Sequence, residues 1–153
     1  MSIRLALVHL NKPHDVAVVA QVVLAAEVEK IFFIGNGVDF LHPKVVSKVM
    51  SWNIDPMLLR NLSTAKMKTL GDVRKEGLRL IGTSPDEKTI SLFSYEPQDN
   101  DVFVLGGANG LSQADRNLLD MTIKIPCSNK ISFLTVSTVV PILVYYVIGK
   151  QRR

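Results

Sequence analysis

The stretch VFVLGGANGLS, residues 102–112, decides how the rest of the chain is interpreted. Its first four residues are apolar and include two valines, which predicts a short buried strand over residues 102–105. Three glycines follow within five residues, and Ser112 suits the start of a helix through residue 119. Glycines permit positive φ angles and let a ligand approach the bare backbone. The stretch predicts a strand, a glycine-rich loop and a helix, in which the loop is either a ligand site or a plain tight turn.

A second stretch, IPCSNKISFLTVS at residues 125–137, follows a similar plan. Residues 122–125 predict another short strand, and residues 134–148 predict a long apolar helix after a polar loop. In a parallel sheet both loops would lie beyond the carboxyl ends of their strands, where ligands bind in such folds. Taken alone, this stretch also fits an ordinary connection capped by Ser132 or Thr135.

The beginning of the chain supplies the topology. Residues 3–10 predict a buried strand, Asp15 can cap a helix that continues through residue 28, and residues 30–34 predict a second strand. This strand–helix–strand unit implies a right-handed crossover between parallel strands. We therefore expect an α/β fold with a mainly parallel sheet and helices on both faces. The remaining expected segments are helices at residues 43–52 and 70–76 and strands at residues 78–82 and 90–93.

Length and composition limit the class of protein. A chain of 153 residues fits a single domain over residues 1–153, and its 47% of apolar residues suggests a buried subunit interface in addition to a core. The single Cys127 excludes an intramolecular disulfide and fits the reducing cytoplasm, and we find no signal peptide. Residues 131–149 have the length of a membrane tail anchor, but Pro141 and four hydroxyl residues favour a buried helix.

Three ordered motifs closely resemble the SpoU branch of the SPOUT methyltransferases. In that family the typical text is L-G-[SN]-E-x-x-G-L-S, then I-P-M, then S-L-N-V-S, similar to the two stretches above. The sequence PHDV at residues 13–16 is similar to the family's opening P-x-N-V-G. The resemblance covers nearly the whole chain and is weakest in the middle. It implies a trefoil knot near the C-terminus that holds S-adenosylmethionine in a bent conformation.

The resemblance also implies which residues hold the cofactor and how the protein assembles. Backbone groups of the two loops would hold the adenine, so Cys127 in place of the family's methionine is tolerable. The family implies a homodimer that packs its first and last helices together, which would use the apolar face of residues 139–148. The cofactor-binding positions carried over are Leu105, Gly106, Gly107, Gly110, Ile125, Cys127 and Leu134.

The polar residues that transfer the methyl group in the family are not retained. Asp15 stands at the family's asparagine, Gln21 at its helix arginine, Ala108 at its loop glutamate and Thr135 at its last asparagine. A ribose hydroxyl needs help to lose its proton, and a glutamine side chain cannot act as a base. We therefore expect an altered catalytic set of Asp15, Gln21 and Thr135. Asp15 is its candidate base for methylating a ring nitrogen or another RNA group, and a helix cap is its alternative role.

These observations favour an S-adenosylmethionine-dependent RNA methyltransferase that acts on tRNA or rRNA and differs from ribose 2′-O enzymes. A non-catalytic SPOUT module that binds the cofactor, RNA or a protein partner is the second hypothesis. A nuclease or nucleotide-binding domain is the third, disfavoured because no cluster of acidic residues suits metal catalysis. The histidines lack H-x-x-x-H spacing, so no metal site is expected.

No separate RNA-binding domain is expected, so the dimer itself would hold RNA. The formal net charge of +4 is compatible with this partner. The candidate RNA contacts are Arg4, Lys12, Lys66, Lys68, Arg74, Lys75 and residues 150–153.

Overall fold

The computed structural model describes residues 2–84, 89–107 and 110–151, and within these ranges one sheet organises the chain. Its strand order is β3-β2-β1-β6-β4-β7-β5, and every neighbouring pair is parallel. The expected α/β fold with a mainly parallel sheet is confirmed. The strands are β1 (Arg4–Val8), β2 (Lys30–Ile34), β3 (Thr64–Met67), β4 (Arg79–Thr83), β5 (Ile90–Ser91), β6 (Asp101–Gly106) and β7 (Met121–Lys124).

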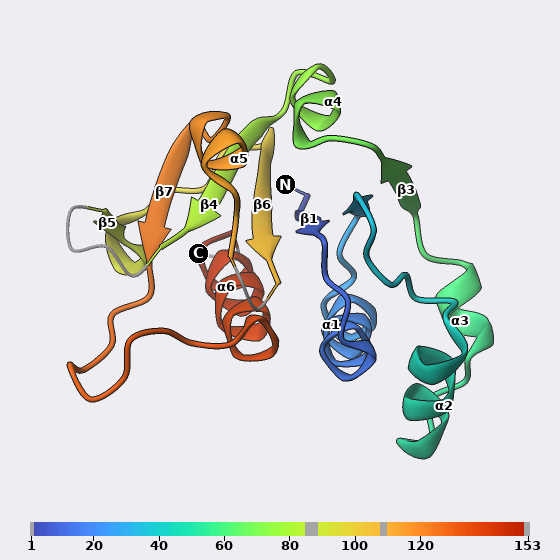
Figure 1. Cartoon of the computed structure of the whole chain (residues 1–153). Coiled ribbons are helices and arrows are strands. Elements are labelled where there is room, and N and C mark those ends of the chain that lie inside the picture. The colour runs from blue at the N-terminus through green and yellow to red at the C-terminus, as the bar shows by residue number, and fades with distance from the viewer. Residues whose placement is uncertain (1, 85–88, 108–109, 152–153) are drawn as a thin grey trace.

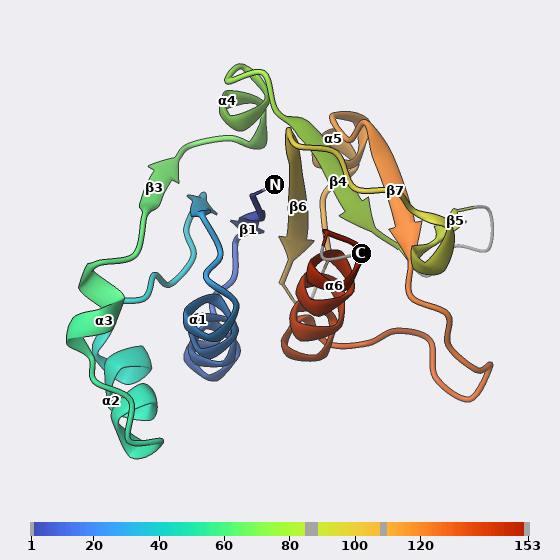
Figure 2. The same ribbon diagram turned by 180° about the vertical axis from the view of Figure 1, so that it is seen from behind.

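Helices cover both faces of this sheet, as expected (Figures 1 and 2). Helices α1 and α6 lie side by side on one face, and α2 packs beside α1. Helices α4 and α5 lie on the other face, where Leu70, Leu118 and Leu119 pack against the strands. The helices are α1 (Pro13–Ala26), α2 (Pro43–Ser51), α3 (Met57–Arg60), α4 (Leu70–Arg74), α5 (Gln113–Asn117) and α6 (Val136–Gln151), with a short 3-10 helix at Leu92–Ser94.

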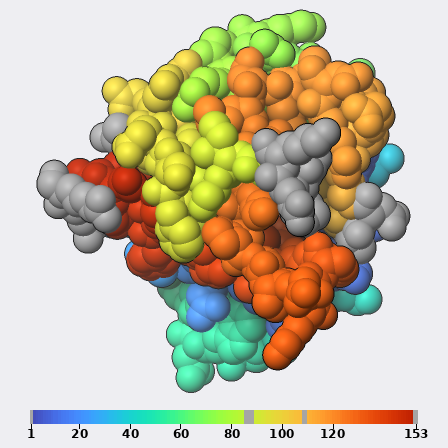
Figure 3. Space-filling view, turned by 90° about the vertical axis from the view of Figure 1, so that its left-hand side faces the viewer, coloured from blue at the N-terminus to red at the C-terminus, as the bar shows by residue number. Residues whose placement is uncertain are grey.

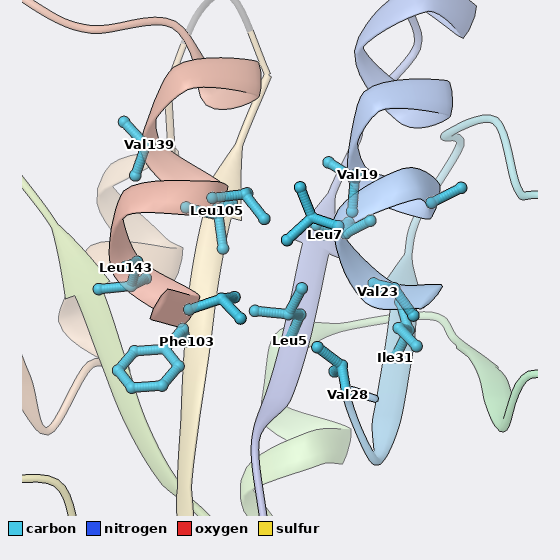
Figure 4. Packing of buried hydrophobic residues seen from close by; sticks show 14 of the residues in the cluster. Leu5, Leu7, Val19, Val23, Val28, Ile31, Phe103, Leu105, Val139 and Leu143 are labelled. Carbon is cyan, nitrogen blue, oxygen red and sulfur yellow. The ribbon is translucent and has the colours of Figure 1, made fainter. Parts of the chain in front are cut away.

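The larger of two hydrophobic clusters lies under α1 and α6 (Figure 4). In this figure Leu5 and Leu7 of β1 point toward Val19 and Val23 of α1, and Phe103 and Leu105 of β6 point toward α6. Alternate residues of the same strands, such as Ala6 and Val104, belong to the smaller cluster on the other face. Because each central strand is buried on both faces, its sequence is continuously apolar.

Two segments in the middle of the chain were not expected. Strand β3 alternates between exposed and half-buried residues at the edge of the sheet, so its sequence, TAKM, has no apolar run. Helix α3 is a single turn whose first N–H groups are satisfied by Asp55. The strand expected at residues 90–93 is shorter, because Ser91 accepts a hydrogen bond from the backbone N–H of Phe93 and begins the 3-10 helix.

The expectation that Asp15 caps the first helix is wrong. Helix α1 begins at Pro13, with Lys12 as its N-cap and no side-chain hydrogen bond at the cap. Proline suits the first helical position because its fixed φ matches the helix and its missing N–H would have no partner there. Asp15 therefore lies within the first turn, and its carboxylate is not used for capping.

The order of strands reverses direction at β1. This strand pairs with β2 on one side and with β6 on the other, so the chain leaves β1 in one direction and returns on the opposite side. Ligands bind at such a reversal, beyond the carboxyl ends of the strands. No helix in the described ranges is long and apolar enough to cross a membrane. The cytoplasmic location and the trefoil knot stay predictions.

Candidate functional site

A cavity of about 840 Å³ opens at the carboxyl ends of β4, β6 and β7. The glycine-rich loop after β6, the segment between β7 and α6, and the first turns of α1 and α6 surround it. In Figure 3, which faces this side of the molecule, the orange segment between β7 and α6 adjoins the yellow-green segment around β5. Cavities of 300–1,000 Å³ are typical of small-molecule and cofactor sites.

All the residues predicted from the sequence to bind the cofactor line this one cavity. They come from two segments that are about twenty residues apart along the chain and that the parallel sheet brings together. Their contributions are mainly backbone and apolar surface, and the thiol of Cys127 bonds at 3.4 Å to the carbonyl oxygen of Ile125. The set is Leu105, Gly106, Gly107, Gly110, Ile125, Cys127 and Leu134.

The glycines of the first loop are required by close backbone contacts. A Cβ on Gly106 would lie 2.8 Å from the carbonyl carbon of Gly110, and one on Gly107 would lie 3.0 Å from the carbonyl oxygen of His9. Gly110 has a φ of +69°, a left-handed conformation that L side chains rarely adopt. Gly106 thus lies close to Gly110, and Gly107 lies against the residue after β1, so that these glycines present bare backbone to the cavity.

The three catalytic candidates have different positions. Asp15, in the first turn of α1, is half-buried and lines the cavity. Thr135 also lines it, and its Oγ1 lies 3.2 Å from Ser137 Oγ and 3.1 Å from Thr138 Oγ1. Gln21 is exposed on α1 and does not line the cavity of its own chain. Ala108, the fourth departure from the family pattern, lies outside the described residues.

None of the charged groups that line the described part of the cavity forms an ion pair with another described residue. Lys12, Arg116 and Lys124 line it together with one carboxylate, Asp15. The ion pairs found among the described residues are all elsewhere: Arg4–Glu29, Lys66–Asp39, Arg74–Asp120, Lys75–Asp72, Arg79–Asp101 and Lys150–Glu96. The described part of the cavity lining therefore carries two more positive than negative charges.

Most of the residues predicted from the sequence to contact RNA take part in those ion pairs, and their role toward RNA stays a prediction. Only Lys12 and the exposed Lys68 are unpaired, and residues 152–153 lie outside the described ranges. The sequence patterns did not single out Arg116 or Lys124 as site residues. Lys124 stands directly before the Ile-Pro motif, a signal that could have been used, whereas Arg116 lies on a short polar helix with nothing in its sequence to single it out.

At the opposite, amino-terminal edge of the sheet a buried ionic network joins β4 to β6. Asp101, 3% exposed, accepts hydrogen bonds from Arg79 at 2.5 and 2.9 Å, from the backbone N–H of Gln98 at 2.9 Å, and from the hydroxyl of Tyr95. Burial, and then the bond to Asp101, raises the pKa of Tyr95, and the same carboxylate raises the pKa of Arg79. In the described ranges no group of three or more metal-ligating side chains is present.

The fold and the cavity together define an α/β domain with a cavity at the carboxyl edge of its parallel sheet. A sequence model of the SpoU rRNA Methylase family matches residues 2–145. The chain therefore belongs to the SpoU rRNA methylase family. Among curated protein sequences, none matches this chain.

Solved structures share this fold. The SpoU methyltransferase AviRb from Streptomyces viridochromogenes, in complex with AdoMet, has a TM-score of 0.81 at 20% identity, over 99% of this chain and 58% of that chain. A TrmH/SpoU tRNA modifying enzyme from A. aeolicus has a TM-score of 0.75 at 14% identity, over 99% of this chain and 76% of that chain. A structure concerned with 2-OH methylation of C/U34 on tRNA has a TM-score of 0.82 at 16% identity, over 99% and 92%. The chain thus spans well under two thirds of the length of AviRb.

Proposed function

We propose that this chain is an S-adenosylmethionine-dependent RNA methyltransferase with a catalytic set unlike that of ribose 2′-O enzymes. The observation that carries the proposal is that every cofactor-binding position implied by the SpoU motifs lines one cavity of about 840 Å³. Tight backbone packing at Gly106 and Gly107 fits a ligand held by bare peptide groups. The trefoil knot of the family belongs to the same proposal.

The bound cofactor would supply an electrophilic methyl group, and the chain would supply its position and a base. Leu105, Ile125 and Leu134 would enclose the adenine, and the glycine loop would offer hydrogen-bonding backbone groups. Asp15 is the one carboxylate among the described cavity-lining residues, so it is our candidate to accept a proton from the RNA group that is methylated. Thr135 would bind substrate or cofactor through its hydroxyl, whereas the exposure of Gln21 gives it no role in the cavity of its own chain.

Isothermal titration calorimetry with S-adenosylmethionine and S-adenosylhomocysteine tests the cofactor site. We expect saturable binding to the wild-type protein and at least a tenfold loss in Gly106→Ala, because its Cβ would collide with backbone that cannot move aside. Gly71→Ala is the matched control, since a Cβ there meets its nearest atoms at 3.7 and 3.9 Å. If the folded wild-type protein binds neither compound, the methyltransferase proposal is wrong.

The second candidate is a binding module without turnover, which the loss of the family's polar residues favours. Methyl incorporation into tRNA and rRNA made by transcription, from radiolabelled cofactor, distinguishes the two. Cofactor binding without any incorporation into either RNA would favour the module.

The proposed assembly is a homodimer through α1 and α6. These helices are neighbours, and α6 exposes Ile142 and Tyr145 at 39% and 50% on its outward side, one turn apart. On α1, Val18, Gln21 and Ala25 recur at the spacing of one outward face. A second copy would cover this apolar surface. Light scattering after size exclusion should find a dimer, and Tyr145→Glu should convert it to a monomer.

A further inference from the structure

Two of the unpaired cations lie on the same side of the sheet. In β7, Met121 and Ile123 point into the core under α6. Because side chains alternate along a strand, Thr122 and Lys124 point to the opposite face, which α5 covers. Arg116 belongs to α5 itself, so it reaches the cavity from this same face.

Arg116 is held in place by the glycine loop. Its Nε donates a hydrogen bond of 3.2 Å to the carbonyl oxygen of Leu111, and its Nη2 lies 3.6 Å from where a Cβ on Gly110 would be. This hydrogen bond places the guanidinium beside the loop and leaves its Nη groups with no hydrogen-bond partner among the described residues. A guanidinium with free Nη groups suits an oxyanion, because it can donate two parallel hydrogen bonds.

No described carboxylate neutralises this end of the cavity. The one acidic residue that lines the cavity, Asp15, belongs to α1 beyond the end of β1, and the sheet order places three strand spacings between β1 and β7. At about 4.8 Å for each spacing, roughly 14 Å separates the two strand ends. An anion bound by Arg116 and Lys124 is therefore distinct from the group that Asp15 could deprotonate.

We propose that Arg116 and Lys124 form a receptor for a phosphate group of the RNA backbone, beside the cofactor loop on the α5 side of the cavity. The identification of the phosphate as part of an RNA rests on the proposed function. The positive charge of the site and the positions of Arg116 and Lys124 do not depend on that proposal. A phosphodiester carries one negative charge delocalised over two oxygens, and these oxygens can accept hydrogen bonds from one guanidinium and one ammonium group. Binding there positions the RNA without reading its bases.

Fluorescence anisotropy with a labelled 20-nucleotide single-stranded RNA of mixed sequence tests the receptor. We expect Arg116→Gln/Lys124→Gln to weaken binding about tenfold at 100 mM KCl and to reduce the slope of log K against log salt by about 0.7, the value for one phosphate contact on a single strand. The matched control is Lys44→Gln/Arg60→Gln, which removes the same charge from exposed, unpaired residues of α2 and α3. The control should keep the wild-type affinity and slope.

Two further measurements separate this proposal from its alternatives. Calorimetry on both double variants should give wild-type affinity for S-adenosylmethionine. If only Arg116→Gln/Lys124→Gln loses affinity for the cofactor while its RNA binding is intact, these cations bind the carboxylate of the cofactor. That outcome would overturn the RNA receptor. Saturable binding of inorganic phosphate as tight as that of RNA would assign the site to free phosphate. If both double variants weaken RNA binding equally, the effect comes from the net charge of the protein, and the proposed receptor is wrong. Failure of the proposed function is seen separately, as absence of cofactor binding by the wild-type protein.

Discussion

The two edges of the sheet use charged residues in opposite ways. At the amino-terminal edge, Arg79 and Asp101 are joined by two hydrogen bonds, and Arg74 pairs at 2.8 Å with Asp120. At the carboxyl edge, Arg116 and Lys124 line a cavity and have no acidic partner among the described residues. Basic residues therefore join strands through ion pairs at the amino-terminal edge, whereas at the carboxyl edge they are available to bind a ligand.

This difference between the two edges distinguishes charged residues that stabilise the fold from charged residues that can bind a ligand. A buried carboxylate is tolerated only when hydrogen bonds replace its lost water, and Asp101 has four such donors. A cation at a solvent-accessible cavity retains water and needs no internal partner. Substitutions at the amino edge should thus change stability, whereas those at the carboxyl edge should change binding or turnover.

The largest effect is expected at the buried network. Asp101→Ala leaves Arg79 and Tyr95 without their partner, so we expect the free energy of unfolding to fall by about 3 kcal/mol. Urea unfolding followed by circular dichroism measures it. Glu96→Ala, which breaks an ion pair whose carboxylate is 78% exposed, should change nothing measurable. Equal losses in both variants would contradict the contrast between buried and exposed pairs.

The next effect concerns turnover. If Asp15 is the base, Asp15→Asn should lower the rate of methyl incorporation about 100-fold, with cofactor affinity unchanged, because the amide cannot accept the proton. Asp55→Asn makes the same replacement outside the cavity at a residue that accepts a hydrogen bond from the Met57 N–H, and should retain full activity. Unchanged activity of the Asp15 variant would remove this residue from the mechanism.

A smaller effect should appear at high pH. The pKa of Tyr95 is raised in the folded protein by burial and by Asp101, so above a pH of about 10 the unfolded chain loses a proton that the folded chain keeps. Its stabilising contribution is complete below that pH and declines as the pH rises, by up to about 1.4 kcal/mol per pH unit. Urea unfolding from pH 8 to 11 should show a steeper decline for wild type than for Tyr95→Phe. Parallel curves would show that the tyrosine does not titrate differently on folding.

The smallest effect is expected from the cavity cations on stability. Arg116→Gln and Lys124→Gln should each change the free energy of unfolding by less than about 0.5 kcal/mol, because neither side chain forms an ion pair with a described residue. The measurement is again urea unfolding. A loss as large as that of Asp101→Ala would mean that these residues hold the carboxyl edge together rather than serve a ligand.

Local sequence patterns predicted the central strands and the residues around the cavity most successfully. Continuous apolar runs predicted the central strands, and the two loop motifs predicted residues that meet around one cavity. These patterns failed at β3, because an edge strand with one exposed face lacks an apolar run. They also misassigned Asp15 as a cap, because Pro13 already starts the helix.

The sequence by itself determined the parallel α/β fold, the family and the positions of the two loops. Apolar periodicity and glycine placement act over a few residues, so they can be recognised without coordinates. Only the tertiary structure decided which charged residues are paired. The β4–β6 pairing brings Arg79 to Asp101, whereas Arg116 bonds to the carbonyl oxygen of Leu111 at the cavity and forms no ion pair with a described residue. Pairing depends on distances between strands and helices, which a linear pattern of charges does not contain.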